Sequence, residues 1–478
     1  MMKLEKITKV PGFDKEDPDN ARQNNYAWSM TGFGDYVYVG TGRNVPYNGY
    51  GNFDLPAPDA FTPENPTMTA EIWRYPKCSH GHKHWERVFR APKEWSVMGF
   101  RSMEVFTDDK GETALYCGCY ARGNGPSYML KSTDGVSWRH IPAGIEPGYS
   151  TRSVKTHKGK LYTSALHQFT TELESFLYVT ENPEKGWTRV NTDTISGEIF
   201  NMISFNGSLY LATMPVGGFE LWRCEDPESG KWKRVIDKGA GDALNECPLS
   251  LEVFEDHLYI GVGISCEFYS TDPVNPWVVP KGFDLIRISK TDKWEVIVGQ
   301  KPIAPTKTTT GTRNLGKYPS GLGNMCNAYC WELRSFGGRL YLGTWDTRRI
   351  NQTFISDFIL RPTMERYKKF GSFLVGFIKS VGKNIIEDDY HMLRWLKAFL
   401  CTYLKREKSL GFDFASSKDG KTFEMISIDG FGNKENMGIR RMYTPDDRIM
   451  YIGTACGSQG CEVWTLEEDK CKCCNSCN

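Results

Sequence analysis

One phrase recurs along this chain of 478 residues, and it constrains the fold more than any other feature. Each copy is a short apolar strand with a tyrosine, followed two residues later by glycine, alanine or serine. The seven tyrosines are Tyr38, Tyr116, Tyr162, Tyr210, Tyr259, Tyr341 and Tyr451. They are 78, 46, 48, 49, 82 and 110 residues apart, so the basic unit has about 46–49 residues and takes insertions. Units of this length are typical of four-stranded propeller blades.

The remaining strands of each unit follow from the same pattern. A third strand such as Glu71–Arg74 comes after each copy, and a fourth begins with an aromatic residue such as Trp232. Apolar and polar residues alternate in these runs, which favours strands over helices. The last unit has no fourth strand after Trp464, whereas Leu4–Ile7 has the right pattern at the other end of the chain. We therefore predict an all-β, seven-bladed β-propeller over residues 1–470, in which the N-terminal strand closes the last blade.

Two of the expected turns between third and fourth strands share a pattern. They run from Ser132 to Trp138 and from Ser417 to Phe423, each with an Asp-Gly pair and a closing aromatic residue. Both turns resemble the Asp-box (BNR-type) repeat of sialidase-like propellers. In that family the aspartate caps backbone N–H groups and the aromatic side chain packs between sheets. The resemblance implies the propeller fold and carries no catalytic residue across.

The large insertions all fall at one end of the expected blades. They follow second strands or connect blades, at residues 42–70, 263–282, 299–328 and 345–411. Loops of both kinds lie on the same face of a propeller, whereas the turns of the opposite face are short in this sequence. Long loops in compact domains are usually functional or disordered. We therefore predict the functional site at the channel mouth that carries the insertions.

The insertion in blade six differs in composition from the rest of the chain. Between Arg361 and Leu410, eleven basic and five acidic residues leave a net charge of +6. Apolar residues recur there at three- and four-residue steps, which predicts a basic amphipathic helical insertion over residues 350–410 and membrane-surface binding through residues 361–408. The residues expected to contact the membrane are Phe373, Phe377, Trp395, Lys397 and Phe399. The alternative is a helical hairpin whose apolar face packs on the propeller or on a second subunit.

Polar and aromatic residues at the starts of first strands and the ends of second strands are expected to surround the mouth. The candidate ligand-binding residues are Trp28, Arg43, Arg101, Arg122, Arg152, His167, Trp331, Asp346 and Arg348. The candidate catalytic residues are Glu198, Tyr329 and Glu332. Arginines can clamp an anionic group while a carboxylate acts as acid or base. The alternative is that these side chains are solvated or paired with one another.

The sequence predicts neither a metal nor an organic cofactor. The eight histidines are not distributed over four blades as an axial iron site requires. Cys78, His80, His82 and His84 lie in an expected exposed turn, for which a solvated segment is favoured over a zinc or copper site. The cysteines of the tail, residues 471–478, are open to metal binding, acylation or no role. No nucleotide-binding motif is present.

The charge and the cysteine content restrict which kinds of partner and which cellular compartment we expect. The 59 basic and 58 acidic residues give a net charge of +1, which argues against nucleic-acid binding. The N-terminus lacks the apolar run of a secretory signal, and no window has the roughly 18 apolar residues that span a bilayer. Fifteen cysteines without a framework spacing are typical of reduced thiols. We therefore expect a cytoplasmic protein, either free or peripheral at a membrane.

These features lead to one leading hypothesis and one alternative. We expect a peripheral membrane propeller that binds an anionic or amphiphilic small molecule at the insertion-bearing mouth. If the protein is an enzyme, we expect a hydrolase or lyase that uses acid/base chemistry. The alternative is a non-catalytic scaffold that holds another protein on the same face. The sequence leaves the oligomeric state open.

Overall fold

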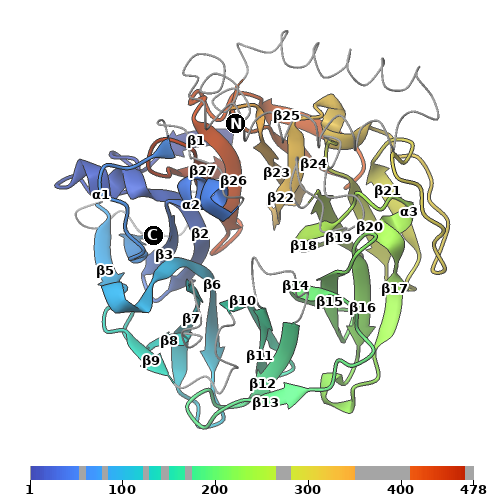
Figure 1. Cartoon of the computed structure of the whole chain (residues 1–478), viewed down its shortest axis with the longest axis horizontal. Helices are drawn as coiled ribbons and strands as arrows, with labels where there is room; N and C mark the ends of the chain where they lie inside the picture. Colours follow the sequence, from blue (N-terminus) through green and yellow to red (C-terminus); the bar gives the residue numbers. More distant parts are fainter. Residues whose placement is uncertain are drawn as a thin grey trace, which may run out of the picture.

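The computed structural model describes residues 2–52, 61–77, 84–121, 129–141, 150–166, 175–264, 281–349 and 410–468. This part of the chain is mostly β, and its antiparallel strands form groups that follow one another around a central axis (Figure 1). The β-rich, propeller-like fold that the sequence predicts is therefore confirmed. No helix in the described residues is long and apolar enough to cross a membrane.

Consecutive strands pair within each group, and we name a group after its first strand. The β2 unit contains β2 (Asn24–Phe33), β3 (Tyr36–Arg43), β4 (Glu71–Pro76) and β5 (Glu86–Arg90). The β6 unit contains β6 (Val97–Thr107), β7 (Thr113–Ala121), β8 (Met129–Ser132) and β9 (Arg139–Ile141). The β10 unit contains β10 (Ser150–His157), β11 (Lys160–Leu166), β12 (Ser175–Thr180) and β13 (Thr188–Val190). The β14 unit contains β14 (Glu198–Phe205), β15 (Ser208–Met214), β16 (Glu220–Cys224) and β17 (Lys233–Ile236).

The remaining units continue around the axis in the same way. The β18 unit contains β18 (Cys247–Phe254), β19 (His257–Gly263), β20 (Leu285–Ser289) and β21 (Trp294–Val298). The β22 unit contains β22 (Asn327–Phe336), β23 (Arg339–Asp346), β24 (Phe414–Ser417) and β25 (Phe423–Ser427). The β26 unit contains β26 (Asn436–Tyr443), β27 (Ile449–Cys456) and β28 (Val463–Glu468). Short helical segments connect strands: α1 (Pro18–Gln23), α2 (Val45–Asn52), α3 (Lys238–Gly241), η2 (Lys93–Trp95), η3 (Pro227–Ser229) and η4 (Ser320–Gly323).

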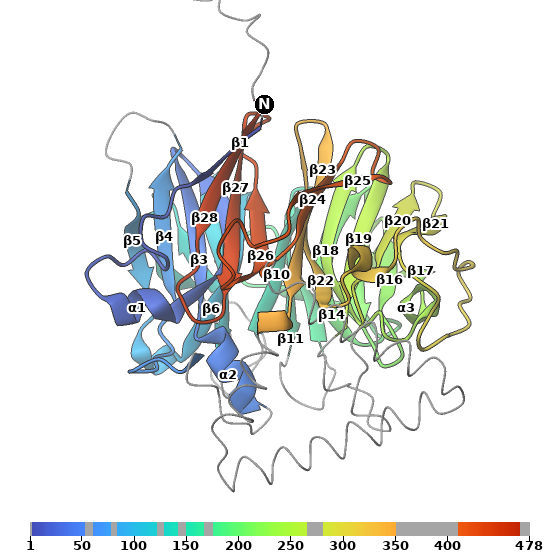
Figure 2. The same cartoon turned by 90° about the horizontal axis from the view of Figure 1, so that it is seen from above.

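The first strands contact one another in sequence around the axis. β2 contacts β6, and the contacts continue through β10, β14, β18, β22 and β26, which contacts β2 again. β1 (Met2–Lys6) pairs antiparallel with β28, with Met2 opposite Glu468 and Lys6 opposite Trp464. Figure 2 shows this N-terminal strand at the same side of the molecule as β27 and β28. Strands from the two ends of the chain therefore belong to one sheet, which covers an edge of β28.

The side chains of the repeated tyrosines are buried where neighbouring units contact each other. All seven are at most 1% exposed. The Tyr162 hydroxyl lies 3.5 Å from Glu228 Oε1, in the turn between the third and fourth strands of the next unit. A Cβ on Gly420, in the corresponding turn of the β22 unit, would overlap the Tyr259 hydroxyl. Each tyrosine thus needs a neighbour that is far away in sequence and adjacent in the ring.

A different contact explains why the residue two positions after each tyrosine is small. A Cβ on Gly343 of β23 would overlap Ile439 of β26, and a Cβ on Gly453 of β27 would overlap Ala27 of β2. Second strands therefore approach the first strand of the next unit too closely for a larger side chain. The phrase recurs because both of its positions form contacts between units.

Asp134 and Asp419 organise the two turns that share the Asp-Gly pattern. Asp134 Oδ1 accepts hydrogen bonds from the backbone N–H groups of Val136 (2.8 Å) and Ser137 (2.7 Å). These hydrogen bonds lower the pKa of Asp134, because they stabilise the carboxylate. Asp419 accepts two equivalent bonds in its own turn. A single carboxylate therefore holds each turn in shape.

A buried asparagine at the start of the first strand ties together separate parts of a unit. Asn436 Nδ2 donates to the Gly430 carbonyl (3.0 Å) in the preceding connection and to Glu462 Oε2 (2.8 Å) beside β28. Thr454 Oγ1 on β27 donates to Asn436 Oδ1 at 3.0 Å. We call this arrangement the asparagine latch. Equivalent latches join Asn24 to Gly12 and Glu71, Asn245 to Gly239 and Asp284, and Asn327 to Gly321 and Asp413.

The latch at Asn24 indicates how the N-terminal strand β1 is connected to β2. Gly12 follows β1 in the chain as Gly430 follows β25. A Cβ on Gly411 would lie 2.7 Å from the Gly430 nitrogen, and a Cβ on Gly460 would overlap the Gly12 backbone in the same manner. The segment after β1 therefore enters β2 as the segment after β25 enters β26.

Several predicted features lie outside the described residues. They include most of the 350–410 insertion with Phe373, Phe377, Trp395, Lys397 and Phe399, the tail 471–478, and the candidates Arg122 and His167.

Candidate functional site

Each first strand carries a β-bulge a few residues after its start. At a bulge, two residues of one strand face a single residue of its partner. The register of β22 against β23, for example, shifts between Cys330 and Glu332, so that Trp331 is the extra residue. We call the extra residues at this position the bulge collar: Trp28, Arg101, Arg152, Phe200, Leu249, Trp331 and Arg440. Bulges redirect side chains and are common next to functional sites.

Three arginines of the bulge collar stack on aromatic rings from a neighbouring unit. The pairs are Arg101 with Trp28 (5.0 Å from the guanidinium carbon to the ring centroid), Arg152 with Phe200 (3.1 Å) and Arg440 with Trp331 (5.2 Å). A cation over an aromatic face gains about 0.5–2 kcal/mol, depending on how far it is desolvated. The rings therefore hold the three guanidinium groups across the boundaries between units.

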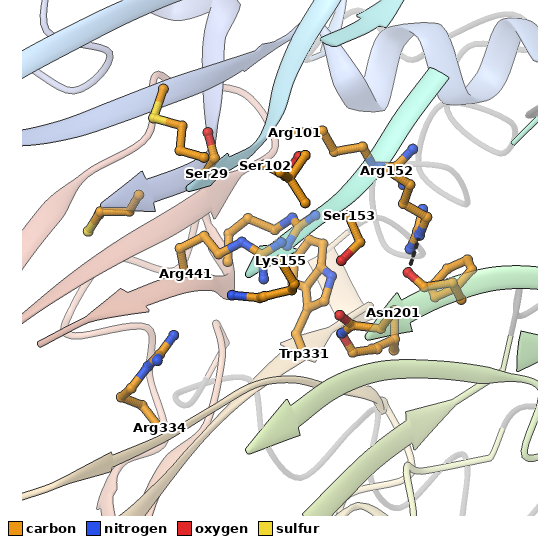
Figure 3. A pocket seen from close by; sticks show the side chains of 16 residues that line it. Ser29, Arg101, Ser102, Arg152, Ser153, Lys155, Asn201, Trp331, Arg334 and Arg441 are labelled. Carbon is orange, nitrogen blue, oxygen red and sulfur yellow. Dashed lines mark hydrogen bonds between the residues drawn. The ribbon is translucent and has the colours of Figure 1, made fainter. Parts of the chain in front are cut away.

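Six of the seven bulge-collar residues, all except Trp28, border a cavity of about 100 Å³ between the first strands (Figure 3). The first strand of every unit contributes to its wall. Six cationic side chains line the cavity: Arg101, Arg152, Lys155, Arg334, Arg440 and Arg441. In Figure 3, Lys155 and Arg441 lie near the centre of the view and Arg334 lies apart from them. Positive charge therefore dominates the wall of the cavity.

Carboxylates on the same strands balance part of this charge. The close pairs are Glu332 with Arg441 (3.0 Å), Glu104 with Lys155 (3.5 Å) and Glu252 with Arg334 (3.7 Å). Glu332 also accepts a hydrogen bond from the backbone N–H of Met442 at 3.3 Å, so both of its carboxylate oxygens are engaged. This predicted catalytic residue therefore acts as a charge partner in the structure.

Arg152 and Arg440 have unused hydrogen-bonding capacity. Among the described residues, no acceptor reaches the buried atoms Arg152 Nη1 and Arg440 Nε. Arg152 Nε donates to the Phe200 carbonyl at 2.8 Å. Burial lowers the pKa of both guanidinium groups, and the charge of Arg101 lowers it further. A guanidinium group stays protonated in proteins, so the positive charges persist and repel one another.

Glu198 is the candidate catalytic residue with a shifted pKa. It is the first residue of β14, two positions before Phe200, and it is 5% exposed. Burial raises the pKa of Glu198 to about 7, although Arg152 and Arg101 favour its charged form and oppose the shift. A carboxyl group that titrates near pH 7 can donate or accept a proton under neutral conditions.

Tyr329 belongs to an aromatic cluster beside the bulge collar. Its ring centroid lies 5.9 Å from that of Trp331 and 4.4 Å from that of Trp345. Tyr26 lies 5.5 Å from Trp331 on another side. Tyr329 therefore supports the ring on which Arg440 stacks.

Four predicted ligand-binding residues within the described part of the chain do not border the cavity: Trp28, Arg43, Asp346 and Arg348. Arg43 is 2% exposed, and its guanidinium group donates to the side chains of Asn20 and Asn24. Arg348 and Asp346 form a buried ion pair at 2.6 Å. These residues stabilise the connections between strands, and the residues that border the cavity do not include them.

The sequence contains a signal for the bulge collar that our predictions did not use. Trp28 precedes Tyr38 by ten residues, and Arg152, Phe200, Leu249 and Trp331 precede their own tyrosines by the same interval. Counting back from each tyrosine would have found Phe200 and Leu249, which we missed. The interval is eleven residues for Arg440, because the turn after β26 is longer.

No known protein family matches this sequence, and no curated protein is similar to it. Among solved structures, the chain is similar to the GH74 enzyme of Niastella koreensis (10% identity, TM-score 0.45), with 95% of this chain and 53% of the enzyme covered. This chain thus spans about half the length of that enzyme. It is also similar to the polysaccharide lyase Uly1 (10% identity, TM-score 0.45, 98% and 99% covered). A third similar structure is the α-L-arabinanase of Penicillium chrysogenum (14% identity, TM-score 0.36, 72% and 94% covered).

Proposed function

We propose that the strand units are the seven blades of one closed β-propeller, with β1 as the outer strand of the last blade. Two observations support this closure. The first strands contact one another from β2 to β26 and from β26 back to β2. The connection from β1 to β2 carries the same asparagine latch as the connection from β25 to β26.

We infer that the channel mouth of this propeller binds an anionic small molecule or the anionic group of an amphiphile. The bulge collar carries this proposal, because Arg101, Arg152 and Arg440 border a single cavity. Their guanidinium groups are buried together, which is electrostatically unfavourable unless a negative charge lies between them. The cavity lies between the first strands, and its lining extends from Phe200 near the start of β14 to Arg334 near the end of β22.

We further propose acid/base chemistry at this mouth, with Glu198 as the proton-transfer group. Its carboxyl group is buried and is influenced by the charges of Arg152 and Arg101, and burial raises its pKa to about 7. Such a group can protonate a leaving oxygen, or can take a proton from water or from carbon next to an anionic group. The reaction class is therefore hydrolysis or elimination. Glu332 is less suited to this role, because Arg441 and the Met442 N–H already engage it.

Alanine substitution of Arg101 or Arg152 distinguishes ligand binding from a scaffold role. Loss of either guanidinium group is expected to abolish the binding of small anions, measured by calorimetry. A protein partner spread over the whole face would barely be affected, because one central arginine contributes little to its interface. Arg448→Ala is the matched control, since Arg448 is exposed and paired with Asp446. Small-anion binding that survives in both collar variants would exclude this site.

The membrane association of the basic insertion remains a proposal from its sequence. Its support is the net charge of +6 between Arg361 and Leu410 and the helical spacing of apolar residues. Attachment of this segment to an anionic surface would bring the channel mouth close to amphiphilic ligands.

A further inference from the structure

We propose that the anion held by the bulge collar is a tetrahedral dianion, inorganic sulfate or a phosphate monoester, rather than a carboxylate. The inference rests on the anion site proposed above and specifies its ligand. Three properties of the site carry it: the direction of its donors, its charge and its size.

The donors approach from three separate strands. Arg101 lies on β6, Arg152 on β10 and Arg440 on β26, and a ring from a neighbouring strand lies against each of them. A carboxylate presents two oxygens in one plane and is matched by one bidentate guanidinium group. Arginines from separate strands reach a common anion from different directions, so they favour oxygens that point in several directions, as they do in a tetrahedral oxyanion.

Two buried donor atoms add to this argument. Arg440 is 6% exposed, and its Nε has no acceptor among the described residues. The same is true of the buried Nη1 of Arg152. A buried N–H group without an acceptor is unfavourable, so a ligand that supplies an oxygen to each atom is favoured.

The charge of the site matches a dianion. Six cationic side chains line the cavity. Among the described residues, four carboxylates interact with them: Glu104, Glu198, Glu252 and Glu332. Within this part of the chain, the cationic side chains outnumber these carboxylates by two when Glu198 is ionised and by three when it is protonated. A dianion matches this difference more closely than a carboxylate, which carries a single negative charge.

The size of the cavity favours a compact group. Its volume is about 100 Å³. A phosphate or sulfate group fits this space. Any larger part of the ligand would extend toward the channel mouth.

Calorimetry with the full chain tests the ligand class. The probes are inorganic sulfate, inorganic phosphate and acetate at constant ionic strength and slightly alkaline pH. Sulfate and phosphate are expected to bind at least about tenfold more tightly than acetate, because they engage more charged donors. A sugar phosphate and a sulfated sugar are compared in the same assay. The phosphate monoester is a dianion at this pH and is expected to bind more tightly than the sulfate ester, which carries a single negative charge.

Variants connect the binding to the bulge collar. Arg440→Gln is expected to weaken sulfate binding by about tenfold or more, since a charge-assisted hydrogen bond is lost. Arg152→Lys keeps the charge and loses the planar fork, so it provides a second test with less risk to folding. Arg448→Gln, at an exposed ion pair, is the control.

The possible outcomes separate this inference from the proposed function. Acetate binding as tightly as sulfate, with the same dependence on Arg440, would overturn the dianion and leave the anion site intact. Absence of binding for all three probes would overturn both. Sulfate binding that does not change in Arg440→Gln and Arg152→Lys would place the anion elsewhere and would also overturn the inference.

Discussion

Arg152 illustrates how single residues prepare the channel for a ligand. Its Nε donates to the Phe200 carbonyl, and the Phe200 ring lies against its guanidinium plane. These contacts fix one edge and one face of the group, while Nη1 is buried without an acceptor among the described residues. A guanidinium group that is already oriented loses little entropy when an anion binds. The arginine is thus preorganised by the neighbouring unit.

Glu198 should make sulfate binding depend on pH near neutrality. Its ionised carboxylate competes with a bound anion for the positive charges of Arg101 and Arg152, whereas its protonated form does not. Because burial raises the pKa of Glu198 to about 7, the affinity for sulfate is expected to be highest below this pH and to fall as pH rises through it. Calorimetric titrations with sulfate across this range measure the effect, since sulfate keeps its charge.

The matched variant for this prediction is Glu198→Gln. It removes the titrating group and keeps a similar volume. Its affinity for sulfate should equal that of the unmodified protein at low pH and should vary little with pH. A pH dependence that persists in this variant would assign the effect to another group.

The asparagine latch shows how an element is held when its contacts are distant in sequence. Asn436 links a connection, a first strand and the carboxylate of Glu462, which is 1% exposed. Glu462 in turn accepts from Trp464 Nε1 at 3.0 Å and pairs with Lys6 of β1 at 3.2 Å. The latch therefore connects the entry of β26 to the N-terminal strand.

Asn436→Ala should destabilise the chain by about 1–3 kcal/mol, because the Gly430 carbonyl and Glu462 lose a buried donor. Urea unfolding monitored by tryptophan fluorescence measures this loss. Asn65→Ala, at an exposed position, is the control and should change the stability by less than about 0.5 kcal/mol. Equal effects of the two substitutions would contradict a structural role for the latch.

The role of the basic insertion depends on whether its apolar face contacts a membrane, the propeller or a partner. The unmodified chain is expected to sediment with anionic liposomes, and replacement of residues 361–408 by a short flexible linker should abolish this. Liposomes without anionic lipid are the control, because the attraction is largely electrostatic. Unchanged sedimentation after the replacement would end the membrane hypothesis and favour packing on the propeller or on a partner.

At the scale of the whole molecule, the cavity depends on contact between strands from the two ends of the chain. Arg440 of β26 and Ser29 of β2 both line it. These residues can face one cavity only when their strands are neighbours, and β26 contacts β2. The proposed closure of the propeller and the proposed anion site are therefore linked.

Deletion of residues 2–6 should weaken this closure. Without β1, the outer edge of β28 loses its partner, and an unpaired edge promotes association with other chains. We expect a lower thermal midpoint and a shift toward oligomers in size-exclusion chromatography. Addition of a synthetic peptide covering residues 1–10 should reverse part of both effects. An unchanged midpoint and elution volume would show that β1 is dispensable.

The β-rich, propeller-like fold could be predicted because its determinants repeat within short segments. The tyrosine and the small residue after it recur in each unit, since both face the next unit in the ring. Four bulge-collar residues could be predicted in the same way, because residues near the starts of first strands were expected to face the channel. They are Trp28, Arg101, Arg152 and Trp331.

Only the tertiary structure decided which arginines border the cavity. Arg43 and Arg348 looked equivalent to Arg152 in the sequence, but Arg43 donates to Asn20 and Asn24, and Arg348 pairs with Asp346. Arg440 was not predicted, although it borders the cavity with a buried Nε that no described residue accepts from. Local patterns determine where a strand lies and which way its side chains face. The set of side chains around the cavity depends on residues hundreds of positions apart, because contacts between the first strands bring them together.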